Sequence, residues 1–486
     1  MNFYIGIDLG TSATKGILVN GEGVIVKEES ANYPPYEKEL PSGWSEHHPE
    51  YWFEAVKIVL RNLSEGLEEE VKGISFGGQM HGLVALDKDD NVIRPCILWN
   101  DGRTEEETKY LNEVVGREAL SAHTGNIAFA GFTAPKLLWL KKHEPQNFAK
   151  IAKIMLPKDY IAYMLTGVFS TDYSDASGTL LLDVEHKCWS KELCEICSVE
   201  ESWLPKLYES YEVTGKVKAE FGLPNAVVTA GAGDNAAAAV GTGTVGDGSC
   251  NISLGTSGTI FLSQDSFSVD EKNALHSFVH ANGKYHLMGC ILSAASANQW
   301  WIENILSDRY DIAERMGEKL GKNEVYFLPY LMGERSPHND VNARGAFIGM
   351  NGATTKEEMS LAVLEGVAFA FRDCLEVAKE NGLVVKESNL CGGGAKSKIW
   401  RTILANVLGV KIDMVETEQG PSFGGAMLAM VGAGEYASVE EAVSAIVKSH
   451  TVALPEPALQ QAYEEKYRKF KKLYPALKSA FADLAQ

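Results

Sequence analysis

An acidic side chain at a glycine-rich corner is the group in this sequence best placed to do chemistry. The corner lies in Val227 to Gly241, VVTAGAGDNAAAAVG, which predicts a buried strand followed by an alanine-rich helix. Asp234 stands where the strand ends and the helix begins. Ligands of open α/β sheets collect at the carboxyl ends of strands, so a substrate has room beside this carboxylate. Asp is also a common capping residue at helix starts, and the segment by itself leaves both interpretations open.

A second acidic residue lies beside a turn of small hydroxyl residues. The stretch from Ile5 to Gly16, IGIDLGTSATKG, predicts a strand, a tight turn at Gly10-Thr11-Ser12 and a return strand. Such a turn exposes backbone N–H groups and hydroxyls together, which suits phosphate oxygens. Asp8, at the end of the first strand, could hold Mg²⁺ directly or through water. An ordinary hairpin is the alternative interpretation.

A further glycine-rich strand end presents a methionine and a histidine. Val71 to Phe76 predicts a strand that runs into GGQMHG, Gly77 to Gly82. Glycines let a backbone approach a ligand closely, so Met80 and His81 could face a substrate there. A histidine in such a place is also often a hydrogen-bonded structural residue.

Two widespread nucleotide-binding motifs are missing from the sequence. No Gly-x-x-x-x-Gly-Lys-Ser/Thr loop occurs, which disfavours a P-loop enzyme. No Gly-x-Gly-x-x-Gly follows the first predicted strand, which counts against a dinucleotide-binding fold.

The elements that must position these residues occur twice. After the glycine-rich linker Gly241 to Ser249, the stretch Asn251 to Leu262 again predicts strand, Gly-Thr-Ser turn and strand, with Thr256 matching Thr11. Asn389 to Gly409 again predicts strand, glycine corner and helix, and echoes Val227 to Gly241 without the acidic residue.

The duplication predicts two related α/β domains, residues 1–245 and 246–486, that face each other across a cleft. Their two hydroxyl-bearing turns could hold a polyphosphate from both sides. Asp234 would then lie on the substrate side, and the GGGAKS corner on the nucleotide side. The C-terminal stretch, 457–486, predicts a charged helical tail.

The bulk properties exclude several classes of protein. The net charge of −20 over 486 residues argues against a nucleic-acid binder. The N-terminal residues predict a strand rather than a signal peptide, and no run approaches the ~20 apolar residues of a membrane helix, so we expect a cytoplasmic protein. Eight scattered cysteines suggest free thiols, and Cys194 and Cys197 lie on a predicted helix face rather than in a clear metal site.

The chain resembles the FGGY carbohydrate kinases, which have the two-domain actin-like ATPase (ribonuclease H-like) α/β fold, and the resemblance runs nearly end to end. The pieces that carry it are IGIDLGTS (5–12), GQMHG (78–82), ILWNDGRT (97–104), GFTAPKLLWL (131–140), LPKDY (156–160), TDYSDASGT (171–179), GDN (233–235), SLGTSG (253–258), LPYLMGERSPH (328–338), GAFIGMNGATTKEEMSLAVLEG (345–366) and GPSFGGA (420–426). Within the family, GQMHG and WNDGR point to the members that phosphorylate D-xylulose.

The resemblance implies a role for each candidate residue. Asp234 would be the general base on the sugar hydroxyl and, with Met80, His81 and Asn235, would line the sugar pocket; Asp8 would serve the Mg²⁺ and phosphate end. The nucleotide side would be formed by the phosphate contacts Thr11, Ser12 and Thr256 and the adenosine contacts Gly393, Gly394 and Ala395. The reaction would be transfer of a phosphoryl group from MgATP to the 5-hydroxyl of D-xylulose in pentose catabolism. Closure about the linker at 241–249 would exclude water, and a homodimer is expected.

Two alternatives remain open. A kinase for another pentulose, a hexulose, a polyol or gluconate would share these motifs, because sugar choice depends on a few contacts worth about 1–3 kcal/mol each. An actin-like ATPase that drives a chaperone or filament, without transfer to a sugar, would share the fold. ATP turnover that responds to a particular sugar would separate all three.

Overall fold

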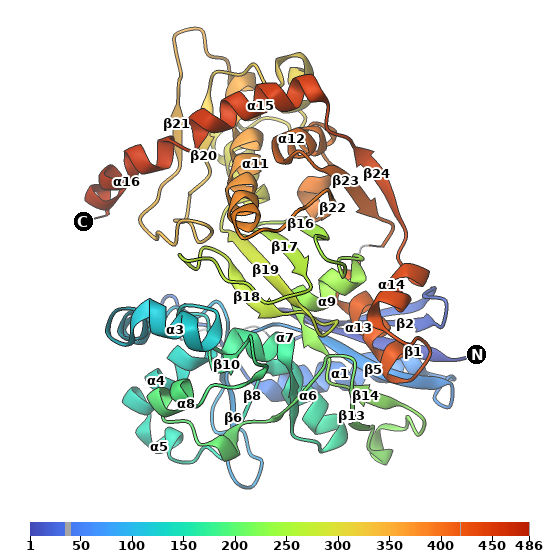
Figure 1. Ribbon diagram of the computed structural model, residues 1–486. Helices are drawn as coiled ribbons and strands as arrows, with labels where there is room; N and C mark the ends of the chain where they lie inside the picture. Colours follow the sequence, from blue (N-terminus) through green and yellow to red (C-terminus); the bar gives the residue numbers. More distant parts are fainter. Residues whose placement is uncertain (35–39, 418, 486) are drawn as a thin grey trace.

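The computed structural model describes residues 1–34, 40–417 and 419–485 and has two lobes, each built on one seven-stranded sheet (Figure 1). The strands of the first sheet are β1 (Phe3–Leu9), β2 (Ala13–Asn20), β3 (Ile25–Asn32), β5 (Val71–Gly78), β13 (Val213–Lys216), β14 (Val227–Thr229) and β15 (Ala232–Gly233). Their order is β13-β14-β5-β1-β2-β3, and β15 continues beside β5. Strands β1, β5 and β14 are parallel, whereas β2, β3 and β13 run antiparallel to their neighbours.

The second sheet repeats this arrangement. Its strands are β16 (Cys250–Leu254), β17 (Gly258–Gln264), β18 (His276–Val279), β19 (Tyr285–Ile291), β22 (Glu387–Cys391), β23 (Lys411–Val415) and β24 (Ser449–Ala453), in the order β18-β19-β17-β16-β22-β23-β24. Antiparallel β19-β17-β16 corresponds to β3-β2-β1, and parallel β16-β22-β23 corresponds to β1-β5-β14. The predicted duplication and the two hairpins with Gly-Thr-Ser turns are therefore confirmed.

One predicted correspondence between the lobes is wrong. The strand β22 pairs with β16 as β5 pairs with β1, so the glycine corner after β22 is equivalent to the corner after β5, at Gly77 to Gly82. The equivalent of β14 is instead β23, which leads into α13 (Gly420–Gly432). Hence the counterpart of the helix that carries Asp234 is α13, not the helix that follows GGGAKS.

Helices cover both faces of the first sheet because its central strand alternates its side chains. Phe3, Ile5 and Ile7 of β1 pack with the amphipathic helix α1 (Pro49–Ser64). Tyr4 of the same strand belongs to the core around α13 on the opposite face. The remaining helices and strands of the first lobe are β4 (Glu46–His47), β6 (Val84–Leu86), β7 (Cys96–Ile97), α2 (Glu105–Lys109), α3 (Arg117–Thr124), α4 (Thr133–His143), α5 (Pro145–Phe148), β8 (Lys153–Met155), α6 (Pro157–Thr166), β9 (Ser170–Asp172), α7 (Tyr173–Ala176), β10 (Leu182–Asp183), β11 (Cys188–Trp189), α8 (Lys191–Cys197) and β12 (Lys206–Tyr208).

The second lobe has its own core around the long helix α11 (Lys356–Glu380). The predicted helical tail is present as α15 (Pro457–Phe470) and α16 (Leu473–Leu484), and the buried Lys466 of α15 pairs with Glu365 of α11 at 2.8 Å. The other α-helices and strands of this lobe are α10 (Ala295–Gln299), β20 (Tyr326–Leu328), β21 (Ala346–Ile348) and α12 (Lys398–Leu408). The helix α14 (Val439–Ile446) belongs instead to the core around α13 on the first sheet.

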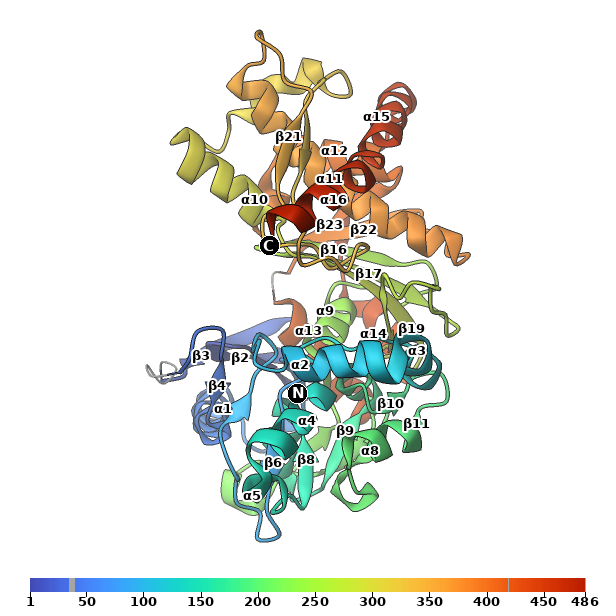
Figure 2. The same cartoon turned by 90° about the vertical axis from the view of Figure 1, so that its left-hand side faces the viewer.

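The helices α9 (Asp234–Gly241) and α13 pack against each other where the lobes meet (Figures 1 and 2). Their backbones touch through glycines, because a Cβ on Gly424 would lie 1.8 Å from the carbonyl oxygen of Ala237. A Cβ on Gly6 of β1 would likewise lie 1.8 Å from the carbonyl oxygen of Ser422, so α13 lies directly on the first sheet. The chain therefore returns to the first lobe after building most of the second, and a division at residues 245 and 246 stays a prediction.

Within the described residues, no helix is long and apolar enough to cross a bilayer. The cysteines of that same part of the chain are all unbridged, and Cys194 and Cys197 are buried on α8. No group of three or more His, Cys, Asp or Glu side chains that could hold a metal occurs in residues 1–34, 40–417 and 419–485.

Candidate active site

Two carboxylates meet at one edge of the first sheet. Asp8 of β1 and Ala232 of β15 both pair with Gly77 of β5, one from each side, and Asp234 follows Ala232 by two residues. Both side chains are half-buried. The pKa of Asp234 is raised to about 7, chiefly by burial and in addition by the negative charge of Asp8. Burial likewise raises the pKa of Asp8 to about 6, against the opposing charge of Lys15.

Asp234 does not act as a helix cap. The capping position of α9 is Gly233, and Asp234 is already the first helical residue. Its Oδ1 atom accepts hydrogen bonds from the backbone N–H (2.7 Å) and the side-chain amide (2.9 Å) of Asn235. The capping interpretation is therefore wrong, and the carboxylate keeps its second oxygen for another partner.

Asn235 and Met80 lie beside this carboxylate, and His81 follows Met80 in the chain. The Asn235 amide donates to the sulfur of Met80 at 3.9 Å. The His81 ring stacks on Phe132 with the centroids 4.6 Å apart, and its Nδ1 lies 2.8 Å from the carbonyl oxygen of Gly178. Burial, followed by the charge of Lys136, lowers the pKa of His81 to about 3. His81 is thus neutral near pH 7, with the proton on Nδ1 and a free acceptor at Nε2.

The backbone of His81 is held in a left-handed conformation, with φ of 69°. Its carbonyl oxygen accepts hydrogen bonds from Thr133 Oγ1 (3.1 Å) and from the fully buried Lys136 Nζ (2.8 Å). Sequence reasoning gave no role to these two residues, although both lie in GFTAPKLLWL. Thr133 and Lys136 of the GFTAPKLLWL motif therefore hold the backbone of His81 and so fix the orientation of its side chain.

Two glycines make room for the substrate-side residues. A Cβ on Gly178 would lie 2.4 Å from the His81 ring, and one on Gly233 would lie 3.0 Å from the Met80 side chain. Sequence reasoning also missed Gly178, which lies in TDYSDASGT. The signal that could have identified it is a glycine that interrupts a stretch of turn residues.

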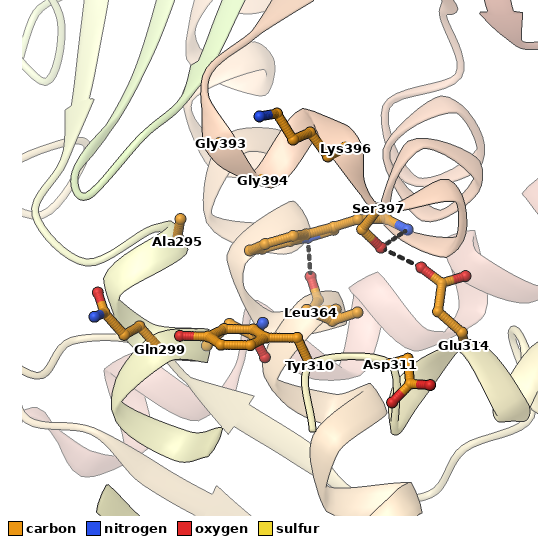
Figure 3. A pocket seen from close by; sticks show the side chains of 12 residues that line it. Ala295, Gln299, Tyr310, Asp311, Glu314, Leu364, Gly393, Gly394, Lys396 and Ser397 are labelled. Atoms are coloured by element: carbon orange, nitrogen blue, oxygen red, sulfur yellow. Dashed lines mark hydrogen bonds between the residues drawn. The ribbon is translucent and has the colours of Figure 1, made fainter. Parts of the chain in front are cut away.

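A cavity of about 410 Å³ lies in the second lobe (Figure 3). Gly393 and Gly394 line it, whereas Ala395 is buried beneath them with 1% of its surface exposed, and the adenosine contact of these residues stays a prediction. The other lining residues are Ala295, Asn298, Gln299, Tyr310, Asp311, Glu314, Leu364, Lys396, Ser397 and Trp400. Lys396 and Ser397 belong to the GGGAKS corner that the sequence places on the nucleotide side, whereas the other eight were not singled out, because they carry no glycine or hydroxyl signature of their own. Their mixture of flat rings and polar groups suits a base and a ribose.

The turn of the second hairpin adjoins this cavity. The carbonyl oxygen of Thr256 accepts hydrogen bonds from the N–H (3.2 Å) and hydroxyl (2.7 Å) of Ser296 in α10, next to Ala295 of the cavity wall. The Thr256 side chain is exposed. In the first hairpin, Ser12 is exposed, and the hydroxyl of Thr11 accepts a hydrogen bond from the Trp99 indole at 3.1 Å.

Comparison with protein families assigns both halves of this architecture. Residues 3–241 match the N-terminal domain, and residues 250–433 the C-terminal domain, of the FGGY family of carbohydrate kinases. The chain belongs to this family. Its fold is accordingly the two-domain actin-like ATPase fold, and the protein is a phosphotransferase.

Individual FGGY kinases are similar over their full length. The chain is 39% identical over 485 residues to a xylulose kinase of Escherichia coli, covering 98% of this chain and 99% of that protein. A solved structure described as a xyloylose kinase from Brucella ovis has a TM-score of 0.93 and 39% identity, covering 99% of this chain and 100% of the other. A gluconate kinase from Lactobacillus acidophilus has a TM-score of 0.94 at 27% identity, with 99% of both chains covered.

Sugar kinases of the FGGY family use ATP with a divalent metal. The donor set at the edge of the first sheet fits such an ion, because Asp8 and Asp234 are neighbouring carboxylates whose pKa values are both raised, and a cation beside them would offset their repulsion.

Substitution of the two cavity-wall glycines, Gly393 and Gly394, by alanine should have different effects in this FGGY kinase. A Cβ on Gly393 would have open space, with no atom within 4 Å, so Gly393→Ala should fold normally and obstruct the nucleotide. We expect the KM for ATP to rise about tenfold, which corresponds to about 1.4 kcal/mol, with kcat and melting temperature little changed. A Cβ on Gly394 would lie 2.6 Å from Leu254, so Gly394→Ala should lower the melting temperature instead. An unchanged KM for ATP in Gly393→Ala would place the nucleotide elsewhere.

Proposed function

We propose that this FGGY kinase transfers the terminal phosphoryl group of ATP to the 5-hydroxyl of D-xylulose, giving D-xylulose 5-phosphate. The observation that carries the proposal is the meeting of Asp8 and Asp234 at one sheet edge, next to the neutral ring of His81. The similarity to the xylulose kinase of Escherichia coli over nearly the whole chain supports D-xylulose as the acceptor.

Asp234 is the general base in this proposal. A neutral hydroxyl is a poor nucleophile, and a carboxylate within hydrogen-bond reach takes its proton while the new P–O bond forms and the bond to ADP breaks. The two donors of Asn235 fix the orientation of the carboxylate. A pKa of about 7 places Asp234 near the working pH, where a base combines sufficient ionisation with a strong tendency to accept the proton.

The remaining site residues orient the two substrates. His81, with Nε2 free to accept, takes a hydrogen bond from a sugar hydroxyl, while Met80 and Asn235 complete the wall beside it. Thr11, Ser12 and Thr256 supply hydroxyls and turn N–H groups to the phosphates. Gly393 and Gly394 form the adenosine side, and the buried Ala395 supports them from beneath instead of contacting the nucleotide. Approach of the two lobes about residues 241–249 would exclude water, which otherwise competes with the sugar as acceptor.

Asp8 holds the divalent metal, which we propose to be Mg²⁺. When bound, the ion supplies positive charge to the phosphate oxygens as negative charge develops on them. We further propose, following the family resemblance, that the protein is a cytoplasmic homodimer. Sedimentation equilibrium of the purified protein tests the dimer.

The experiment that tests the substrate is a coupled ADP-release assay with D-xylulose against other ketoses, polyols and gluconate. We expect the largest kcat/KM for D-xylulose. The specific rival is gluconate, because a gluconate kinase has nearly the same fold as this chain. A larger kcat/KM for gluconate or for another sugar would replace D-xylulose in the proposal. The alternative of an actin-like ATPase without sugar transfer is disfavoured, because the chain belongs to a family of carbohydrate kinases.

Asp8→Asn is expected to lower kcat and shift the pH profile. Loss of the metal-side carboxylate should reduce kcat by about 10²-fold or more and raise the Mg²⁺ concentration needed for half-maximal rate. Because the charge of Asp8 helps to raise the pKa of Asp234, the variant should retain base function to lower pH, and the acidic limb of kcat/KM should move down from about 7. Rates measured from pH 5 to 9 at several Mg²⁺ concentrations test both effects. An Mg²⁺ dependence equal to that of wild type would remove Asp8 from the metal site.

A further inference from the structure

Arg335 belongs to the second lobe but lies against the sugar side of the first. It lies in the loop between β20 and β21, and its guanidinium carbon is 5.0 Å from the centre of the Phe129 ring. Phe129 packs edge-on against Phe132 with the centroids 5.4 Å apart, and Phe132 stacks on His81. A continuous row of three rings therefore leads from the guanidinium to the residue that we place at the sugar.

The charge of Arg335 shifts the pKa values of groups at the site itself. After burial and Lys136, it is a further cause of the lowered pKa of His81. It also opposes the burial that raises the pKa of Cys290, a thiol that the charge of Asp234 influences as well. The guanidinium, His81 and the proposed base thus share one neighbourhood, although they come from different lobes.

The Arg335 guanidinium makes no ion pair with a carboxylate in the part of the chain that the structure describes, although its charge opposes the burial that raises the pKa of the adjacent Glu334. The adjacent Glu334 accepts from the backbone N–H of Arg335 (2.8 Å) and of Leu292 (2.9 Å), not from the guanidinium. The guanidinium is half-buried, and its side-chain contacts within the described residues are with the Phe129 ring and the Cys290 thiol. These contacts occupy only part of the N–H donors of the guanidinium, so several donors remain for a ligand.

The loop is fixed on both sides of Arg335. The backbone N–H of Ser336 donates to the carbonyl oxygen of Cys290 (3.0 Å), and the N–H of Cys290 donates to the Ser336 hydroxyl (3.1 Å). The Glu334 carboxylate accepts a hydrogen bond from the backbone N–H of Leu292, the residue that follows β19. The guanidinium is therefore presented by a backbone tied to the second sheet, which reduces the entropy lost when it binds a ligand.

We propose that Arg335 is a binding residue for the acceptor sugar, donating hydrogen bonds from the second lobe to the sugar's hydroxyl or carbonyl oxygens. The planar fork of an arginine matches two neighbouring oxygens of a sugar chain. Its position beside Phe129 and near His81 favours the acceptor over ATP, whose phosphates we assign to the hairpin turns. The inference deepens the proposed function and rests on it, because it places a second-lobe residue at the same sugar site.

The test compares Arg335→Met and Arg335→Lys with wild type. Methionine retains an apolar stem beside Phe129 without donors, and lysine retains the charge without the fork. With ATP saturating, we expect the KM for D-xylulose to rise by roughly 10- to 100-fold in Arg335→Met and by less in Arg335→Lys, because a hydrogen bond from a charged group is lost. The KM for ATP should stay within about twofold, a separation that damage to the fold would not produce.

Two controls sharpen the experiment. Arg344→Met removes an exposed arginine of the same loop that donates only to the carbonyl oxygens of Val341 and Ala343, and should leave all kinetic constants unchanged. Deoxy analogues of D-xylulose, each lacking one hydroxyl, identify the contact. If Arg335 binds a hydroxyl, the penalty of Arg335→Met should vanish for the analogue that lacks it; if it binds only the carbonyl, the penalty should vanish for the polyol that replaces the ketone.

Other outcomes overturn the inference. A fall in kcat with an unchanged KM for the sugar and a raised KM for ATP would place the guanidinium at the transferred phosphoryl group. Unchanged kinetics in both variants, with wild-type melting temperatures, would leave Arg335 as a packing residue on Phe129. Failure of wild type to phosphorylate D-xylulose would contradict the proposed function instead, and the same comparison would then be made with the sugar that the panel identifies.

Discussion

Asp234→Asn should abolish sugar phosphorylation while leaving ATP bound. Asparagine keeps an oxygen to accept the hydrogen bonds from Asn235 but cannot take a proton from the sugar. We expect kcat to fall by about 10²- to 10⁴-fold, the range that a positioned base contributes. The coupled ADP-release assay measures the loss, and calorimetric titration with an ATP analogue checks that the nucleotide still binds. A kcat close to that of wild type would refute the assignment of the base.

The same substitution should stabilise the protein in a pH-dependent way. The native pKa of Asp234 is raised to about 7, above its unfolded value near 3.9, so the native state holds this proton more tightly than the unfolded chain. The resulting stability is fully present below about pH 4 and is lost as the pH rises through 7. Asparagine has no proton to lose, so we expect an excess stability on the order of 4 kcal/mol at pH 8 that disappears near pH 4.

Melting curves of both proteins across this pH range measure the effect. Asp183→Asn is a suitable control, because that half-exposed carboxylate lies away from the site and pairs with His186. Its difference from wild type should stay small and should not grow between pH 5 and 8. A gain in stability together with a loss of activity is the expected signature of a residue kept for chemistry rather than for the fold.

Lys158→Met should be among the most destabilising single substitutions in the first lobe. Lys158 Nζ is fully buried, 2.7 Å from Asp159, 2.8 Å from Asp172 and 3.7 Å from Asp175. Burial lowers the pKa of this lysine, but the three carboxylates outweigh that effect and raise it overall. Removal of the cation leaves their charges buried together, for which we expect a loss of about 3–5 kcal/mol in the free energy of unfolding.

Denaturant melts of the first-lobe transition measure this loss. The matched control is Lys142→Met, which removes an ion pair of 2.5 Å with Glu106 at the surface and should cost less than about 1 kcal/mol. Activity should fall as well, because Ser174 links the cluster to the site: its hydroxyl donates to Asp172 (2.5 Å) and accepts from the N–H of Gly233 (3.1 Å), next to Asp234. Equal stability losses in the two variants would show that the buried cation is not needed.

The local elements of this fold could be predicted because their signals lie within a few residues. The helix Pro49–Ser64 and both Gly-Thr-Ser hairpins follow from apolar periodicity and turn chemistry. The equivalence of the glycine corners could not be predicted in the same way. Corners after β14 and β22 look alike in sequence, whereas their true relation depends on which distant strand each one pairs with.

The candidate site shows the same limit. Asp8 and Asp234 could be singled out from the sequence because an acidic residue beside glycines at a strand end is a local signal, although each segment alone left a structural alternative open. Gly178, Lys136 and Arg335 act through contacts with His81 and its neighbours that span 40 or more positions in the chain, and nothing in their own segments marks those contacts. The cavity wall is likewise assembled from four separate stretches, of which only the glycine-rich one has a sequence signature.

The position of α13 on the first sheet bears on how the protein is made. A ribosome releases β1 and β5 long before residues 420–432, so the face of the sheet that awaits this helix is exposed while more than 300 further residues are synthesised. The N-terminal half therefore reaches its native core only when the chain is almost complete. A nascent chain stalled before residue 420 would be a client for chaperones, and the release of the last 70 residues would be the moment at which both halves become stable together.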